Sequence, residues 1–449
     1  MKNKMVVGGL AALALLALPL AAGADGMDLH GATLRLQNHW GWTYQDYVDG
    51  GAQQEWREWV EEEFNVKIEF SERNFGTFAD DLTASVLNGD PIVDIFRNAG
   101  IAETIRLARA DVILPVDDVL PADYLDRTPS FSRNYAEVMG SYDGTTYGIN
   151  MNHEAIFLGV VFNKTLLERE GLPSPYDLMD AGEWDFDAFK DIALKATKDA
   201  DGDGEIDQWG LTFGQWGHAE PHILQRQAIW FAMANGGSVV SEQGGSKVFA
   251  LNDSRAVEAV DLLAELNAAG AVRGASYDQV QLFFENNVAM GVIDSGWMEH
   301  FVNPEKMSEP VGLVPLPMGP QGGGQVYQRV IGETFLIPRN SKLDPAAVIE
   351  VFSALYKVTA PYADIEEVET AYYANWDEKR AGDERTSQFL RDAEANQVLI
   401  PGAEMIGQEG YELLLATLGG AIAGEVSAST ALAEITPTIQ ALVDDLWEQ

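Results

Sequence analysis

The strongest chemical motif in the chain is the acidic stretch Asp199–Asp207, which reads DADGDGEID. Its aspartates occupy positions 1, 3, 5 and 9 of an EF-hand calcium loop, and glycine occupies position 6. In such a loop hard oxygen ligands converge on a hard cation, and the glycine permits a tight bend. We therefore expect a structural calcium ion. Its expected ligands are Asp199, Asp201, Asp203, Glu205 and Asp207.

The same stretch also departs from the calcium motif. Position 12 is Gly210, where an EF-hand loop carries a bidentate glutamate. Another group or a water molecule would have to supply that ligand. Without a cation, several carboxylates this close would repel one another. The alternative interpretation is a solvated acidic turn that holds no ion.

Other residue patterns in the chain bear on metal binding and catalysis. His218 and His222 lie four residues apart, which is a zinc-ligand spacing, but Pro221 stands between them and no third ligand is nearby. A helix start with polar flanks is the preferred interpretation. The chain has no G-x-S-x-G, H-E-x-x-H or phosphate-loop motif, so we expect no enzyme. A secreted glycosidase, which needs only two suitably spaced carboxylates, is the minor alternative.

The first elements that would position a site are three strands separated by helices. The expected strands are Thr33–Gln37, Val66–Phe70 and Ile92–Phe96. Strands that alternate with amphipathic helices predict parallel βαβ crossovers. Ligands of such sheets bind beyond the carboxyl ends of the strands. This indicates Trp40, the segment Glu72–Asn74, and Arg97 with Asn98 as candidate contacts.

A second set of elements follows an expected two-residue hairpin turn at Asp143 and Gly144. The continuous apolar run Ala155–Phe162 is typical of a strand buried on both faces, which predicts a parallel sheet covered by helices. We expect this strand to leave one lobe and enter another. Val311–Pro315 is expected to return to the first lobe, and Asp344–Val358 is expected to be a helix of the second.

The first 24 residues have the pattern of a cleavable signal peptide. Lys2 and Lys4 precede the apolar run Met5–Leu18, and Ala22–Ala24 supplies small residues for cleavage. A membrane anchor is the alternative, but the run is shorter than the ~20 residues that a span needs. The chain has no cysteine for a lipid anchor or a disulfide. We expect export to the periplasm or the cell exterior.

Length and charge limit the possible functions further. A chain of 449 residues with 46% hydrophobic content is large enough for two domains. Its net charge of -41 disfavours nucleic acid, which demands a basic surface, and anionic membranes. Solubility, in a salty medium that screens self-repulsion, is the simplest account of this charge. An acidic cleft that attracts its ligand is the alternative.

Five segments follow one another in a recognisable order: EEEFNVKIEF, NGDPIVDIFRNAG, LPVDDVL, TTYGI and GVVFNKTLLE. Their order and spacing resemble the family 1 extracellular solute-binding proteins, the carbohydrate-binding subunits of ABC importers that include maltose-binding protein. The resemblance covers nearly the whole mature chain. Phe162 stands where the family usually has tyrosine, and Ile149–Asn150 stands where a proline often follows Tyr-Gly.

The resemblance implies an α/β, two-lobed periplasmic-binding-protein fold of the type II class. Each lobe is expected to be a mostly parallel sheet flanked by helices, and several short segments are expected to join the lobes. The expected N-terminal lobe comprises residues 25–154 and 311–337, and the C-terminal lobe 155–310 and 338–449. A similar acidic loop recurs in members of the family, which favours the calcium interpretation.

The resemblance also implies how the protein works. A sugar lies between the lobes, aromatic rings cover its C–H faces, and polar groups hold its hydroxyls until hinge closure completes the site. The permease of an importer is the expected partner of a monomer. The expected contacts are Trp40, Arg73, Arg97, Asn98, Glu154, Trp216 and Trp297. Carboxylates and aromatic rings also form cation cages, so a polyamine or another cationic solute is the alternative ligand.

Overall fold

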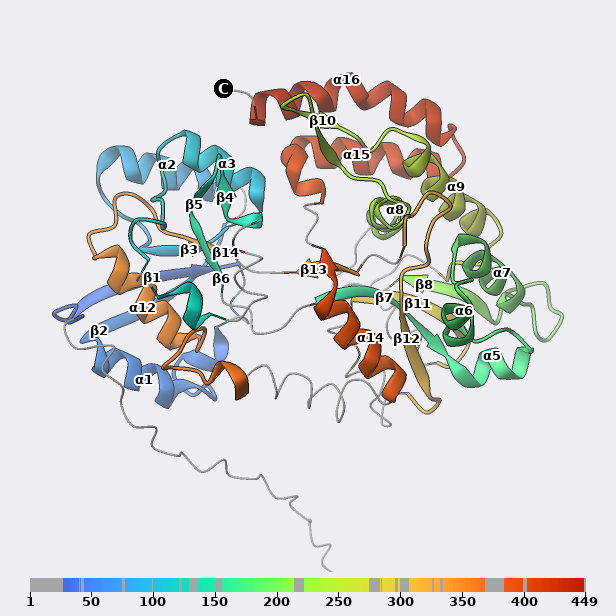
Figure 1. The fold of residues 1–449 in the computed structure, drawn as a ribbon, viewed down its shortest axis with the longest axis horizontal. Helices are drawn as coiled ribbons and strands as arrows, with labels where there is room; N and C mark the ends of the chain where they lie inside the picture. Colours follow the sequence, from blue (N-terminus) through green and yellow to red (C-terminus); the bar gives the residue numbers. More distant parts are fainter. Residues whose placement is uncertain are drawn as a thin grey trace, which may run out of the picture.

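A computed structural model describes residues 27–447 apart from 40, 42–43, 75–76, 99, 121–122, 129–135, 137, 151–155, 214–221, 274–282, 284, 295–297, 299–306, 325–326, 332–333, 368–382 and 399–401. Figure 1 shows two lobes, each built around one sheet with helices packed against it. The buried hydrophobic side chains of the described residues form four clusters, and the largest contains residues of both lobes, such as Ile105 and Leu418.

Strand β1 (Ala32–Asn38) lies inside the first sheet and buries Leu34 and Leu36. It pairs in parallel with β2 (Val66–Glu72) and with β3 (Ile95–Arg97). The helices α1 (Gln54–Glu63) and α2 (Phe78–Asn88) connect these three strands in turn. The predicted βαβ crossovers are confirmed.

Two later strands complete the first sheet. β14 (Thr334–Leu336) is antiparallel to β3 and to β6 (Gly148–Asn150), which gives the order β2-β1-β3-β14-β6. The sheet is therefore mixed rather than mostly parallel. The cause is that β14 enters from the other lobe and not through a crossover helix.

Helix α12 (Pro345–Leu355) belongs to the first lobe. Phe352 shares a buried cluster with Leu34 and Leu36, and every residue from 347 to 355 is buried. The prediction that this helix lies in the second lobe was wrong. Only a short connection separates α12 from β14, and its apolar surface fills the core beside that strand.

Strand β7 (Ile156–Asn163) is the centre of the second sheet, whose order is β15-β13-β7-β11-β8 with β12 also paired to β7. The other strands are β8 (Trp209–Phe213), β11 (Val288–Asp294), β12 (Val311–Pro315), β13 (Tyr327–Ile331) and β15 (Gln397–Val398). β7 is buried as predicted, but each of its partners β11, β12 and β13 runs antiparallel to it. A buried apolar run requires covered faces, and it does not fix the direction of its neighbours.

The strand Val311–Pro315 does not return to the first lobe, so that prediction was also wrong. It pairs with residues Gly159–Asn163 of β7, and Gly159 allows the close approach. A Cβ atom at Gly159 would lie 2.8 Å from the carbonyl oxygen of Val314. The return to the first lobe comes later, between β13 and β14.

The remaining helices and short strands surround these two sheets. In the first lobe these are η2 (Gln45–Tyr47), α3 (Ile101–Arg109), η3 (Leu125–Arg127), β4 (Ser141–Tyr142) and β5 (Thr145–Thr146). In the second lobe they are α5 (Lys164–Glu170), α6 (Pro175–Ala181), α7 (Phe186–Ala196), α8 (Ile223–Ala234), β9 (Val240–Gln243), β10 (Ser246–Phe249), α9 (Ser254–Ala268), α14 (Glu384–Ala395), η6 (Ala403–Ile406), α15 (Gly407–Ile422) and α16 (Ala428–Trp447).

Local signals in the sequence place several of these ends. Asp143 and Gly144 have φ angles of 49° and 72°, so the predicted tight hairpin between β4 and β5 is confirmed. Asp185 caps α7 by accepting a hydrogen bond from the amide of Ala188, as predicted. The lobes also touch away from the strands, where Arg109 of α3 donates to the carbonyl of Leu446 in α16.

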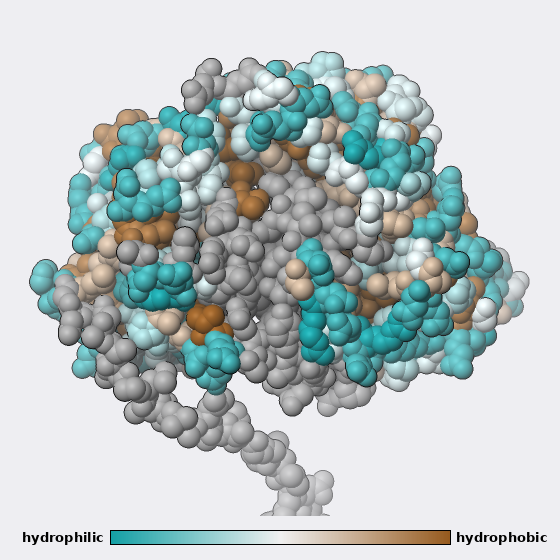
Figure 2. Space-filling view, in the orientation of Figure 1, coloured by the Kyte–Doolittle hydropathy of each residue, from teal (hydrophilic) through white to brown (hydrophobic). Residues whose placement is uncertain are grey.

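The outer surface agrees with the composition. Figure 2 shows hydrophilic residues over much of the described surface in this view and hydrophobic residues in smaller areas. Among the described helices, none combines the length and the apolar character that crossing a bilayer requires.

Candidate functional site

The carboxyl ends of β1, β2 and β3 lie at one edge of the first sheet, because the three strands are parallel. At the same edge β14 begins with Thr334 and β6 ends with Asn150, and these two residues pair. The amide of Asn98, just past β3, donates to the carbonyl of Thr334 at 2.9 Å. The edge thus gathers polar residues from five strands.

A corresponding edge exists in the second sheet. β8 and β11 are parallel and end at Phe213 and Asp294, and β7 begins at the same edge because it is antiparallel to β11. β13 ends there as well, since Ile331 pairs with Ile156. The side chain of Asp294 is buried at this edge.

The two edges face each other across the boundary between the lobes. Ile331 ends β13 and Thr334 begins β14, so three Cα steps join the sheets and span at most about 11 Å. Six steps join Asn150 to Ile156, which span at most about 23 Å. A ligand held between these edges would therefore contact both lobes.

Arg73 follows β2 and is almost completely buried. Its Nη1 atom donates to the carbonyl of Arg97 at 3.0 Å and to Glu103 Oε2 at 3.0 Å, and its Nη2 atom pairs with the other Glu103 oxygen. The guanidinium carbon also lies 4.6 Å from the centre of the Phe78 ring. These bonds fix the side chain and tie the ends of β2 and β3 to the first turn of α3.

Arg97 and Asn98 point to different neighbours, as the alternation of adjacent side chains predicts. Arg97 Nη1 donates to Asn38 Oδ1 at 3.4 Å, toward the end of β1. Asn98 Nδ2 donates to the Thr104 hydroxyl at 2.8 Å and to the Gly100 carbonyl at 3.1 Å. Asn98 therefore anchors the start of α3, and Arg97 belongs to the strand-end cluster.

His39 is a member of this cluster that the sequence analysis missed. It follows the last residue of β1 and is buried. Burial, and then the positive charges of Arg97 and Arg73, lower the pKa of its imidazole to about 3. The side chain is therefore neutral at pH 7. Its position one residue past a strand end becomes informative only once the neighbouring Arg73 and Arg97 are known.

Asn150, Thr334 and Asp294 were also missed. Each is the first or last residue of a strand at one of the facing edges. Their positions at strand ends could have indicated them, but only if the sequence also showed which strand ends lie at the same edge of a sheet. Trp40, Glu154, Trp216 and Trp297, which the sequence predicts as contacts, lie outside the described residues.

The acidic loop between α7 and β8 brings three of its five predicted ligands together. Carboxylate oxygens of Asp199, Asp201 and Asp207 lie within 4.8 Å of one another, whereas Asp203 and Glu205 are not in this group. The loop is shaped by its own hydrogen bonds, in which Asp199 accepts from the amides of Gly202 and Gly204 at 2.6 and 2.8 Å. Three convergent oxygen donors are chemically suited to a hard cation.

The histidine pair gives no corresponding group. His222 immediately precedes α8, in agreement with the predicted helix start, and His218 lies outside the described residues. Among the described residues, the only group of three or more candidate metal ligands is the aspartate triplet of the acidic loop.

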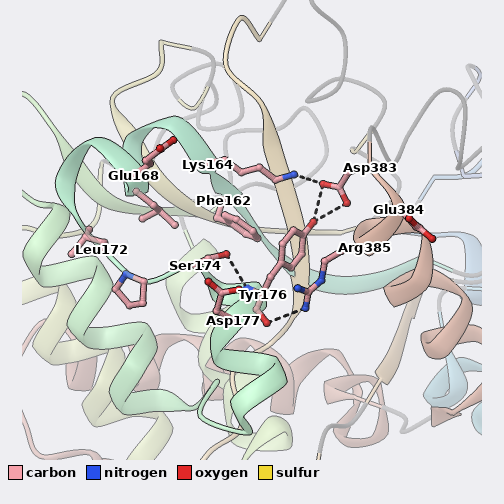
Figure 3. A pocket seen from close by; sticks show the side chains of 12 residues that line it. Phe162, Lys164, Glu168, Leu172, Ser174, Tyr176, Asp177, Asp383, Glu384 and Arg385 are labelled. Atoms are coloured by element: carbon pink, nitrogen blue, oxygen red, sulfur yellow. Dashed lines mark hydrogen bonds and ion pairs between the residues drawn. The ribbon is translucent and has the colours of Figure 1, made fainter.

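A cavity of about 670 Å³ lies in the second lobe beside Phe162, Lys164 and Tyr176 (Figure 3). Tyr176 Oη lies 3.0 Å from Asp383 Oδ2, and Lys164 pairs with the same carboxylate. These bonds attach the start of α14 to the wall of the cavity. The cavity adjoins the carboxyl end of β7, about 23 Å along the strand from the facing edges.

The comparisons with known proteins agree with this arrangement. Residues 47–357 match the family model described as bacterial extracellular solute-binding protein. No curated protein matches the chain by sequence.

Solved structures share the fold at low sequence identity. The GacH receptor of Streptomyces glaucescens, solved without ligand and with acarbose, is 20% identical, with a TM-score of 0.63 over 92% of this chain and 99% of that chain. A cyclic alpha-maltosyl-1,6-maltose binding protein of Arthrobacter globiformis is 17% identical, with a TM-score of 0.63 over 92% and 99%. The MalE domain of Bdellovibrio bacteriovorus, bound to maltotriose, is 17% identical, with a TM-score of 0.62 over 92% and 100%. All three have the two-lobed α/β fold.

Proposed function

Since the chain belongs to the bacterial extracellular solute-binding proteins, we propose that it captures a carbohydrate between its lobes and delivers it unchanged to the permease of an ABC importer. The observation that carries this proposal is the pair of strand-end edges that face each other across the lobe boundary. Similar structures with bound acarbose and maltotriose support a carbohydrate as the ligand class.

Capture follows from the connections between the lobes. Asn150 and Ile156, and likewise Ile331 and Thr334, are only a few residues apart, so the proposed closure moves each lobe as a unit while each sheet keeps its own hydrogen bonds. A ligand shifts the open and closed populations only if it binds the closed form more tightly. A sugar that contacts both edges satisfies this condition, because half of its contacts are absent when the lobes are apart.

The chemistry of the first edge suits a ligand rich in hydroxyl groups. Arg73 is held by Glu103, and Asn98 is held by Thr104, so the polar surface is formed before the ligand arrives. Charged groups form stronger hydrogen bonds with hydroxyls than neutral groups do. We propose that Trp40, Glu154, Trp216 and Trp297 complete the site as aromatic and carboxylate contacts.

A cationic solute is less well supported than a sugar. The first edge carries Arg73 and Arg97, whose positive charges, after burial, lower the pKa of His39. A ligand cation at this edge would approach Arg97, and the similar structures with bound acarbose and maltotriose favour a sugar.

A thermal-shift panel tests the function. Neutral mono- and oligosaccharides are compared with polyamines, since a ligand at a hundredfold excess over its Kd adds about 2.7 kcal/mol to the free energy of unfolding. We expect a rise in Tm with at least one oligosaccharide and none with polyamines. A rise with polyamines alone, or turnover of any bound sugar, would overturn the proposal.

We propose further that calcium binds Asp199, Asp201 and Asp207 as a structural ion. The loop lies between α7 and β8, and its three aspartates converge without contributing to either facing edge. We also propose that residues 1–24 are removed on export to the periplasm or the cell exterior, and that the mature protein acts as a monomer.

A further inference from the structure

β2, one of the two edge strands of the first sheet, ends beside two stacked aromatic rings. The ring centres of Tyr44 and Phe70 are 5.0 Å apart and their planes differ by 7°. Both residues are partly exposed. Phe70 belongs to β2, and Tyr44 follows β1 just before η2, so the rings lie at the same edge as Arg73 and Arg97.

The carboxylate of Glu72 lies next to these rings. Glu72 is the exposed last residue of β2, and a Cβ atom on Gly41 would collide with its Oε1 atom. The Tyr44 hydroxyl oxygen is 3.6 Å from the same Cβ position. The carboxylate of Glu72 and the hydroxyl of Tyr44 therefore lie close to the same point beside Gly41.

The electrostatics keep the Tyr44 hydroxyl protonated. Burial, and then the negative charge of Glu72, raise the pKa of its phenol above the ordinary value. The pair therefore offers one hydroxyl, which donates and accepts, and one carboxylate, which accepts. Sugar hydroxyls can pair with both, while an aromatic ring covers the C–H face of a sugar.

Tyr47 shows how a tyrosine of the core differs. Its ring packs edge-on against Tyr356 at 5.4 Å, and burial raises the pKa of its phenol to about 12. The carboxylate that also raises this pKa, after burial, belongs to Asp46 of η2 and not to a strand end. Packing alone accounts for Tyr47, but it does not account for the polar groups gathered at Gly41.

The position of the pair gives the length of the ligand. In the order β2-β1-β3-β14, three strand spacings separate Glu72 from Thr334, which is about 14 Å. A single sugar ring held near the links between the lobes does not extend over that distance. A chain of several sugars along the strand ends does.

We propose that Tyr44 and Glu72 form an outer sugar subsite, and that the protein's ligand is therefore an oligosaccharide rather than a monosaccharide. This inference rests on the proposed carbohydrate function. The ring stacks on one sugar of the chain, and the carboxylate accepts hydrogen bonds from its hydroxyls.

The test is isothermal titration with oligosaccharides of one linkage type and increasing length, beginning with the monosaccharide. We expect the wild type to bind the longer members more tightly. Tyr44→Ala and Glu72→Gln should each raise the Kd of the longest members about tenfold and leave the Kd of the shortest member that binds unchanged. The decisive quantity is the ratio between the Kd of the longest sugar and the Kd of the shortest sugar that binds.

Matched variants separate a subsite from a change in charge or folding. Glu69→Gln removes the same charge from an exposed residue of β2 that pairs with Lys67, and it should leave every Kd unchanged. Tyr44→Phe keeps the ring and removes the hydroxyl, so it tests the site if Tyr44→Ala does not fold. We expect Tyr44→Phe to lose less affinity than Glu72→Gln, and again only for the longer oligosaccharides.

The outcomes distinguish this inference from the function on which it rests. If the wild type binds sugars but the monosaccharide binds as tightly as longer members, the inference is overturned and the function stands. The inference is also overturned if the variants weaken binding equally for sugars of all lengths, or if neither variant weakens binding. If no carbohydrate of any length binds, the proposed function itself fails.

Discussion

Arg73 and Glu103 form a two-point ion pair where β2 ends and α3 begins. Their side chains are 3% and 10% exposed. Because Arg73 also donates to the carbonyl of Arg97, the pair joins β2, β3 and α3 at one point. The sequence predicts Arg73 as a ligand contact, and the structure shows that its guanidinium group positions the surrounding strand ends.

Removing Glu103 should therefore destabilise the first lobe. In Glu103→Ala the Arg73 guanidinium stays buried without its countercharge, and breaking such a pair costs about 3–5 kcal/mol. The measurement is denaturant unfolding followed by tryptophan fluorescence. The double variant Arg73→Met with Glu103→Leu should lose less free energy of unfolding than the sum of the losses in Arg73→Met and Glu103→Leu alone. The reason is that the double variant leaves no uncompensated buried charge. A loss below about 1 kcal/mol in Glu103→Ala would contradict the role of the pair.

His39 should make the folded state sensitive to mild acid. Its pKa is about 3 in the folded protein, because the side chain is buried near Arg97 and Arg73, and about 6.5 in the unfolded chain. Between these values the unfolded state binds more protons, so the free energy of unfolding falls as the pH falls. The loss from this group between pH 6.5 and pH 5 is about 1–2 kcal/mol.

The variant His39→Gln isolates that contribution. Unfolding of the variant and the wild type is compared at pH 6.5 and pH 5, where the remaining titratable groups are the same in both proteins. We expect the wild type to lose about 1–2 kcal/mol more than the variant over this interval. Equal losses would show that the imidazole becomes protonated in the folded state near its ordinary pKa.

The acidic loop predicts a stability effect that is separate from ligand binding. Calcium should raise the Tm of the wild type and a chelator should reverse the rise, because an ion that binds only the folded state stabilises it. Asp201→Asn should weaken this response and leave the Kd for sugar unchanged, since the loop is not at either facing edge.

A control on the neighbouring helix tests whether the loop is responsible. Asp187 of α7 is exposed and lies outside the aspartate triplet. Asp187→Asn makes the same change in charge and should retain the full response to calcium. If neither the wild type nor this control responds to calcium, the acidic stretch is a solvated turn.

The parts of the fold that local pattern determines were predictable. Alternation of Leu34 and Leu36, followed by an amphipathic helix, was sufficient to predict a strand and its parallel crossover. Asp143 and Gly144 were sufficient to predict a tight hairpin, because few residues adopt positive φ. These features depend on residues close together in the chain.

The errors concern contacts between distant parts of the chain. The apolar run of β7 shows burial, but the antiparallel neighbours at Val311–Pro315 depend on pairing across about 150 residues. The Arg73–Glu103 pair spans 30 positions and leaves no local pattern. His39 was missed because a lone histidine near a strand end carries no signal until the arginines beside it are known.

The net charge of -41 leads to a final prediction about salt. The chain has 70 acidic and 29 basic residues, so most surface carboxylates have no basic partner and repel one another in the folded state. The distance over which charges interact falls from about 30 Å at 0.01 M salt to about 3 Å at 1 M. Added NaCl should therefore stabilise the fold by weakening the repulsion.

Thermal unfolding between 0.01 M and 1 M NaCl, with chelator present throughout, measures this effect without interference from the calcium loop. We expect Tm to rise by several degrees, most steeply at low salt, where screening changes most. The buried Arg73–Glu103 pair is screened little, so Glu103→Ala should show the same slope from a lower starting Tm. Sucrose at equal osmolarity serves as the uncharged control. A Tm that falls with NaCl would mean that attractive pairs outweigh the repulsion.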